Sequence, residues 1–215
     1  MPPEKKEGKR LKIGVCVPLY NLVPSVFHTH FVNFFVNASR DYSLRLFQID
    51  SVAVDVARNV LVEEFLKSDC DYLLFLDSDI VFPPNIIDLL VGHEKDFVSA
   101  IYFTRKKIKP MHHILKDGNY VSPTEVKPGQ LVEADAVGLG CSLIRREVIE
   151  KVSAQNKGLP LFKMDFKSRT EFEGEDIYFC RLVQKAGFKI FVDTGTLVGH
   201  YGVIAPESAF RDYVY

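Results

Sequence analysis

Short apolar runs alternate with segments of helical periodicity over the first half of the chain. The apolar runs are rich in β-branched residues and predict strands at 11–19, 43–50, 71–77 and 96–103; the periodic segments predict helices at 23–36, 51–66 and 84–93. We expect Ser51 to cap the second helix, with Val52, Val56, Val60 and Leu61 on its apolar face. This alternation predicts an α/β fold with a Rossmann-like, mostly parallel sheet flanked by helices.

The pattern changes between 104 and about 133, where short alternating runs are separated by the turn dipeptides Asp117-Gly118 and Pro128-Gly129. We expect a small antiparallel hairpin or flap region there. Regular structure returns with strands at 140–146 and 189–193 and helices at 147–154 and 175–187. We therefore interpret 1–11 as a disordered tail and 12–215 as a single domain.

Composition and charge narrow the possible partners. The chain has 215 residues, of which 47% are hydrophobic, so it can bury a sizeable core. Lys and Arg number 27 against 28 Asp and Glu, and this balance argues against a nucleic-acid partner. No apolar stretch is long enough to span a membrane, and the four cysteines are scattered as in proteins of a reducing compartment, so we expect a cytoplasmic protein.

Two carboxylates follow the predicted strand in "LLFLDSDIVFPP". Asp77 and Asp79 project from the carboxyl end of a strand that we expect to be buried on both faces, and ligands of such sheets bind at this edge. Carboxylate oxygens there suit a hard divalent ion such as Mg²⁺ or Mn²⁺. The alternative is that these aspartates only form a turn or cap the helix that follows Pro83 and Pro84.

Two further signals lie in the second half of the chain. "EFEGEDIYF" places Glu175 and Asp176 in the first turn of a helix, where they could receive a proton from an acceptor hydroxyl or simply cap the helix. "VDTGTLVGHYG" places His200 in a glycine-bearing segment after the last predicted strand. A lone histidine is more often structural than a ligand, but together with the acidic elements it becomes a candidate metal ligand.

These residues resemble the nucleotide-sugar-dependent glycosyltransferases of the GT-A fold. The resemblance covers roughly 12–202 and rests on an ordered set of motifs: "VPLYN", "ARN", "LLFLDSDIVFPP", "AVGLGCSLIRREVIEK", "GEDIYFCRLVQKAGFKIFVD" and "GHYG". More narrowly, the chain resembles glycosyltransferase domains encoded by large DNA viruses of algae, which implies a viral protein acting in the host cytoplasm. The resemblance also implies a nucleotide-binding half at 12–103 and an acceptor-binding, metal-completing half at 104–215.

The resemblance assigns a role to each matching position. Asp79 would bind Mn²⁺ or Mg²⁺ directly, Asp77 would contact the ribose and the metal shell, and His200 would join the same metal. Glu175 and Asp176 would be the catalytic acidic pair that faces sugar and acceptor. The remaining donor-binding positions are Pro18, Leu19, Tyr20, Asp50, Arg58 and Ser78 around the nucleotide, and Gly138 to Gly140 beside the donor sugar.

The implied function is transfer of a hexose from a UDP-sugar such as UDP-glucose, or from a dTDP-sugar, to a hydroxyl group of a glycan or other acceptor. The usual D-D-G-S run is missing after the second strand, so Asp55 competes with Asp50 for recognition of the base. The late histidine favours a retaining mechanism, whereas the G-E-D element is common among inverting enzymes.

Two alternative functions remain at this stage. A sugar-nucleotide nucleotidyltransferase usually has a glycine-rich basic loop after the first strand, and "PLYNLVPS" has neither glycine nor a basic residue. A non-catalytic sugar-binding module on the same fold would not need Asp77, Asp79, Asp176 and His200 together. The phenylalanines between 27 and 35 are expected in the core, although one edge of their helix could stack against an acceptor.

Overall fold

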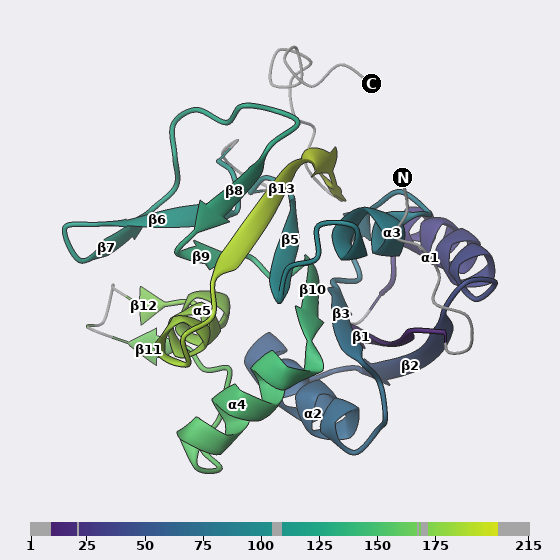
Figure 1. Ribbon diagram of the computed structural model, residues 1–215, viewed down its shortest axis with the longest axis horizontal. Helices are drawn as coiled ribbons and strands as arrows, with labels where there is room; N and C mark the ends of the chain where they lie inside the picture. Colours follow the sequence, from purple (N-terminus) through teal and green to yellow (C-terminus); the bar gives the residue numbers. More distant parts are fainter. Residues whose placement is uncertain (1–9, 21, 105–108, 167, 169–171, 202–215) are drawn as a thin grey trace.

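A seven-stranded sheet forms the centre of the molecule in a computed structural model that describes residues 10–20, 22–104, 109–166, 168 and 172–201. Its strand order is β2-β1-β3-β10-β5-β13-β8 (Figure 1). The strands are β1 (Lys12–Pro18), β2 (Ser43–Ile49), β3 (Tyr72–Leu76), β5 (Phe97–Ile101), β8 (Leu131–Ala134), β10 (Cys141–Arg145) and β13 (Ile190–Leu197). The expected tail at 1–11 lies almost entirely outside the described residues.

Most strands of this sheet run in the same direction. β1 pairs in parallel with β2 and β3, and β5 pairs in parallel with β13. β10 lies antiparallel between β3 and β5, and β8 pairs antiparallel with β13 at the sheet edge. The prediction of a mixed α/β fold with a mostly parallel sheet is confirmed, and the reversed β10 carries the segment around Gly140 to the carboxyl end of β3.

Helices cover both faces of the sheet. α1 (Ser25–Ala38) and α3 (Ile86–Val91) pack on one face through residues such as Phe34 and Ile87. α2 (Val54–Leu66), α4 (Arg146–Asn156) and α5 (Glu175–Lys185) pack on the other through residues such as Phe65 and Phe179 (Figure 1). Side chains of β3 alternate between these two core clusters, as a strand buried on both faces requires.

The start of α2 differs from the prediction. The helix begins at Val54 with Ala53 at the N-cap, and Ser51 has a left-handed backbone with φ of 58°. An N-cap residue normally has an extended backbone, so Ser51 cannot cap this helix. The buried face is also rotated from the predicted one, because Val56 is 47% exposed whereas Arg58 is buried. An apolar pattern could not predict the burial of Arg58, because this burial depends on an ion-pair network that compensates its charge.

Three small antiparallel sheets complete the described structure. β6 (His112–Lys116) pairs with β7 (Asn119–Val121) and β9 (Ala136–Val137), which confirms the expected hairpin region. β4 (Ile80–Val81) pairs with β14 (Gly199–His200), and β11 (Asp165–Phe166) pairs with β12 (Phe172–Glu173) directly before α5. Within the described residues, no helix combines the length and the apolar character that crossing a membrane requires.

Candidate active site at the carboxyl edge of β3

The end of β3 brings the two aspartates of the D-S-D element to the sheet edge. The Asp77 backbone N–H donates to the Gly140 carbonyl at 2.9 Å, so β10 fixes the point where β3 ends. The chain then forms β4, which pairs with β14 so that Ile80 lies opposite His200. The Tyr201 N–H donates to the Asp79 carbonyl at 2.7 Å. This small sheet brings the late histidine next to the second aspartate.

Asp79 and His200 lie side by side, as the sequence predicts. His200 Nε2 is 3.5 Å from Asp79 Oδ2, and both side chains are largely shielded from solvent, with 17% and 21% exposed. The other ring nitrogen, Nδ1, is 3.1 Å from the Phe103 carbonyl oxygen, which can only accept a hydrogen bond. When the ring is neutral, Nδ1 therefore carries the proton, and Nε2 on the side of Asp79 is the nitrogen that could bind a metal ion.

The donor atoms of this pair fit a divalent ion that binds together with phosphate. Within the described part of the chain, no three His, Cys, Asp or Glu side chains are grouped closely enough to hold a metal ion alone. Mg²⁺-type sites in phosphate-transferring proteins commonly use one or two protein ligands, and substrate phosphates and water supply the rest. Asp79 and His200 fit such a site, which a diphosphate would complete.

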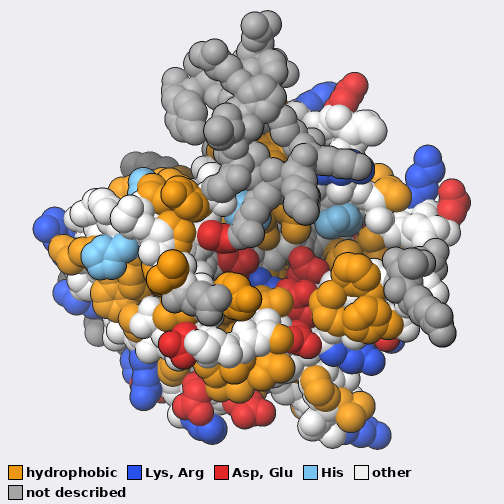
Figure 2. All heavy atoms as spheres, turned by 180° about the vertical axis from the view of Figure 1, so that it is seen from behind, with side chains coloured by type: hydrophobic (Ala, Val, Ile, Leu, Met, Phe, Trp, Pro, Cys, Tyr) orange, Lys and Arg blue, Asp and Glu red, His pale blue; other side chains and the backbone are white. Residues whose placement is uncertain are grey.

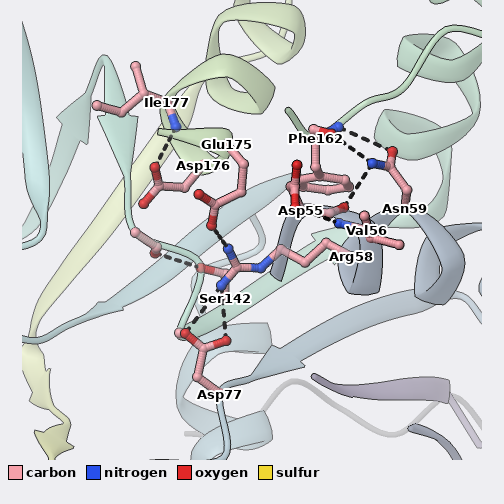
Figure 3. Close-up of polar contacts among 12 residues, drawn as sticks. Asp55, Val56, Arg58, Asn59, Asp77, Ser142, Phe162, Glu175, Asp176 and Ile177 are labelled. Atoms are coloured by element: carbon pink, nitrogen blue, oxygen red, sulfur yellow. Dashed lines mark hydrogen bonds and ion pairs between the residues drawn. The ribbon is translucent and has the colours of Figure 1, made fainter. Parts of the chain in front are cut away.

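Arg58 links Asp77 to α5 (Figure 3). Its Nη2 donates to both oxygens of Asp77, at 2.9 and 3.2 Å, and its Nη1 donates to Glu175 Oε1. The guanidinium is almost fully buried. Burial lowers the pKa of Arg58, but the charges of Asp77 and Glu175 outweigh it and hold the pKa above its usual value. Arg58 therefore stays protonated and joins helix α2, strand β3 and helix α5 at one point.

Glu175 and Asp176 begin α5 beside this guanidinium. Burial raises the pKa of each carboxyl above its usual range, while the positive charge of Arg58 opposes this effect. Asp176 Oδ1 also accepts the Ile177 N–H at 2.8 Å. A carboxylate with a raised pKa is a better proton acceptor than an ordinary surface carboxylate. The two carboxyls at the start of α5 therefore differ in their pKa from ordinary surface carboxyls.

Two glycines pack against a buried tyrosine next to Asp77. A Cβ atom on Gly138 would lie 2.2 Å from the Tyr102 hydroxyl, and one on Gly140 would lie 3.2 Å from Asp77 Oδ2. The Gly140 N–H donates to the Tyr102 hydroxyl at 3.0 Å, and the Tyr102 ring meets the His200 ring edge to face at 5.6 Å. The loop predicted to lie beside the donor sugar therefore contacts the acidic site, and a Cβ atom at position 138 would collide with Tyr102.

The residues expected around the nucleotide lie at the same sheet edge but differ in how exposed they are there. Pro18 is buried at the end of β1, the Leu19 N–H donates to the Ile49 carbonyl at 2.8 Å, and Tyr20 is 69% exposed. Asp50 is exposed directly after β2, and Ser78 is half-buried between the two aspartates of the motif. Figure 2 shows acidic side chains gathered near the middle of one face, with basic atoms between them.

Comparisons with known proteins support the fold. No family model and no curated protein matches this chain. Among solved structures, the chain is similar to the crystal structure of A197 from STIV, with 21% sequence identity and a TM-score of 0.55. The similarity covers 89% of this chain and 85% of that chain. At 21% identity the similarity establishes a shared architecture only. The roles of individual residues rest on the geometry described above.

Two structural residues of the site were not recognised in the sequence. Asn59 binds the loop before β11: its Oδ1 accepts the Leu161 N–H at 2.8 Å, and its Nδ2 donates to the Phe162 carbonyl at 2.7 Å (Figure 3). Tyr102 supports both the Gly138–Gly140 loop and His200. A buried tyrosine at a strand end needs a partner for its hydroxyl group, and this requirement was the available signal for Tyr102.

Proposed function

We propose that this protein is a metal-dependent glycosyltransferase that moves a sugar from a nucleoside diphosphate sugar to an acceptor hydroxyl. The main support is that the side chains of Asp79 and His200 lie next to each other beside the carboxyl end of β3. Arg58 joins the neighbouring Asp77 to Glu175, so the two acidic motifs and the late histidine belong to one region. The GT-A resemblance assigns the same residues to donor and metal binding.

Asp79 and His200 would hold Mn²⁺ or Mg²⁺ together with the donor diphosphate. When bound, the ion would act as a Lewis acid that stabilises the negative charge of the departing nucleoside diphosphate. Asp77, held by Arg58, would orient the ribose and the water molecules around the ion. The Phe103 carbonyl, 3.1 Å from His200 Nδ1, would hold the proton on that nitrogen, so that Nε2 would be the nitrogen that binds the ion.

The acidic pair would serve the acceptor side of the reaction. The ion pair with Arg58 fixes the position of the Glu175 carboxylate. Asp176, with a pKa raised by burial, would accept the proton of the attacking hydroxyl. The protein supplies no covalent nucleophile in this scheme; it aligns the acceptor oxygen with the anomeric carbon and receives its proton.

We infer a UDP-sugar such as UDP-glucose as the preferred donor and a dTDP-sugar as the second choice. Pro18, Leu19 and Tyr20 would contact the base and ribose, with Asp50 or Asp55 as the polar partner of the base. In the GT-A resemblance a late metal-binding histidine favours retention of the anomeric configuration, whereas direct displacement with Asp176 as the base would invert it; the anomeric configuration of the product distinguishes the two. The acceptor would be a glycan or another molecule with a free hydroxyl group.

Turnover of a nucleotide-sugar panel tests this proposal. UDP-glucose, UDP-galactose, dTDP-glucose and GDP-mannose would be incubated with the protein in Mn²⁺ or in chelator, and released nucleoside diphosphate would be measured. We expect slow release from a UDP- or dTDP-sugar in Mn²⁺ only. Tight nucleotide binding without release would indicate a sugar-binding module, and release of pyrophosphate from a nucleoside triphosphate and a sugar phosphate would indicate a nucleotidyltransferase.

A further inference from the structure

The β11–β12 hairpin exposes two aromatic rings directly before the acidic pair. Phe166 is 68% exposed and Phe172 is 58% exposed. The two residues are direct cross-strand partners, and their ring centroids lie 5.8 Å apart with planes inclined by 40°. Exposing two large apolar rings to water is unfavourable. Two such rings side by side on one face of a hairpin therefore suggest a binding surface.

An ion-pair anchor under the hairpin holds the rings outward. The neighbouring cross-strand pair is Asp165 opposite Glu173, whose side chains point to the opposite face because strand side chains alternate. Arg181 of α5 contacts both: its Nη1 is 2.8 Å from Glu173 Oε2 and its Nη2 is 3.4 Å from Asp165 Oδ2. Glu173 is buried by this contact. Phe166 and Phe172 must therefore face away from α5.

The rings are also tied to the candidate catalytic carboxylates along the chain. Phe172 is followed by Glu173, Gly174 and Glu175, so the Cα atoms of Phe172 and Glu175 can be at most about 11 Å apart. Figure 1 shows β11 and β12 next to α5, and Figure 2 shows hydrophobic side chains bordering the acidic ones on one face. A molecule resting on the rings can thus extend toward Glu175.

We propose that Phe166 and Phe172 form a stacking platform for a sugar ring of the acceptor; this inference rests on the proposed glycosyltransferase function. The face of a pyranose ring carries C–H groups, which pack favourably on the electron-rich face of a phenyl ring, while the hydroxyl groups at its rim remain in water. The platform would hold one sugar unit of the acceptor while a hydroxyl of that unit or the next approaches Asp176.

The exposed area favours a sugar over a second protein chain. Two phenylalanine side chains at these exposures offer together about 250 Å² of apolar surface. A stable protein–protein interface needs about 800 Å² on each partner. The phenylalanines of α1, which could also have served as a platform, are unsuitable where the structure buries them: Phe27 and Phe34 pack against Phe82 in the core.

An array of defined oligosaccharides tests the platform without knowledge of the natural acceptor. The wild-type protein, Phe166→Ala/Phe172→Ala and Phe166→Trp/Phe172→Trp would be compared, with Val36→Ala on α1 as an exposed apolar control. For the glycans that the wild-type protein binds, we expect the double alanine variant to bind at least about tenfold more weakly. The tryptophan variant should keep affinity within about threefold, because it retains both aromatic faces.

Several results would overturn the platform. These are equal glycan binding by the alanine variant, no glycan binding by the wild-type protein, and a change in sedimentation from dimer to monomer on removing the rings. Melting temperatures of all variants would show whether a loss of binding reflects unfolding. Titration of the wild-type protein with UDP or dTDP in Mn²⁺ separates the two claims. Nucleotide binding together with ring-independent glycan binding refutes the platform only, whereas absence of binding of both nucleotides refutes the proposed function itself.

Discussion

Arg58 is the residue on which the arrangement of the acidic site depends. It is buried, and it places one positive charge between Asp77 and Glu175, with Asp176 close by. Buried carboxylates without a partner are costly, so the three acids can gather here only because the guanidinium compensates much of their charge. Arg58 of the "ARN" motif was assigned to the nucleotide pocket from the sequence; in the structure it contacts the acids, while the neighbouring Asn59 contacts a loop.

Replacing Arg58 with alanine should destabilise the protein strongly. The change leaves the largely buried Glu175 carboxylate and the partly buried Asp77 carboxylate without a counter-charge. Loss of one partner of a buried ion pair costs about 3 to 5 kcal/mol. Urea unfolding at pH 7 measures this loss, with Arg45→Ala on the exposed edge strand β2 as a control expected to stay within about 0.5 kcal/mol. Combining Arg58→Met with Asp77→Asn and Glu175→Gln should recover much of the stability. An Arg58→Ala variant as stable as the control would contradict the network.

Replacing His200 with alanine should weaken metal-dependent nucleotide binding. The variant loses the Nε2 lone pair that faces Asp79, so the Mn²⁺ concentration needed for half-maximal UDP binding should rise at least about tenfold. His28→Ala, which removes an exposed histidine of α1, is the matched control. If the Mn²⁺ requirement of His200→Ala equals that of the control, His200 is not a metal ligand and the preference for a retaining mechanism loses its support.

At the scale of elements, a bulge in β13 places His200. The register of β13 with β5 shifts between Asp193 and Leu197, and Asp193 fixes this bulge. Its Oδ1 accepts the Gly195 N–H at 2.8 Å and its Oδ2 accepts the Thr196 hydroxyl at 2.6 Å, while His93 Nε2 lies 2.9 Å from Oδ2. The bulge redirects the chain after the last central strand, so that β14 can pair with β4.

The Asp193→Asn variant should lose stability at neutral pH. Burial raises the pKa of Asp193, but hydrogen bonds from His93, Thr196 and Gly195 outweigh it and hold the pKa below its usual value. A carboxyl with a lowered folded-state pKa stabilises the protein above its unfolded pKa of about 3.9, and this contribution disappears as the pH falls through the lower folded value. We therefore expect a deficit of about 2 kcal/mol at pH 7 that shrinks below about pH 4.

Urea unfolding between pH 3 and pH 7 measures this deficit. Asp117→Asn is the control, since Asp117 is an exposed turn residue with φ of 50°, a conformation that asparagine also tolerates. A deficit that stays constant down to pH 3, or one that appears equally in the control, would mean that the charge of Asp193 does not hold the bulge.

Six of the seven strands of the central sheet could be predicted from the sequence, whereas β8 was assigned to the hairpin or flap region and the start of α2 was misplaced. β3 is an uninterrupted apolar run because both of its faces are buried, so its position and its role in presenting Asp77 were readable. Ser51 looked like a helix cap, but caps depend on a backbone conformation that sequence pattern does not reveal. The antiparallel direction of β10 was equally hidden, since an apolar run carries no information about strand direction.

The candidate site was predicted in part for a related reason. The sequence showed which residues could bind a metal or accept a proton, and the pairing of His200 with Asp79 is confirmed by the structure. The contacts of Arg58 and Tyr102 were missed because they join segments far apart in the chain. A pattern within one segment cannot show such contacts.

At the scale of the whole molecule, the sheet collects the site at one edge. The segments that follow β1, β2 and β3 reach the same edge because these strands are parallel, and β10, α5 and β14 approach it from the second half of the chain. The shared architecture with A197 from STIV extends over most of both chains. The two halves of the sequence therefore contribute different parts of one site, the first half the D-S-D element and the second half the histidine and the acidic pair.

Calorimetric titration with UDP, in Mn²⁺ and in chelator, tests the central claim most directly. The claim is that Asp79 and His200 hold a divalent ion that completes its shell with a nucleoside diphosphate. We expect UDP to bind the wild-type protein in Mn²⁺, to bind at least about tenfold more weakly in chelator, and to bind Asp79→Asn in Mn²⁺ with a similar weakening. Equal UDP affinity with and without Mn²⁺, or an Asp79→Asn variant that binds UDP like the wild-type protein, would contradict it.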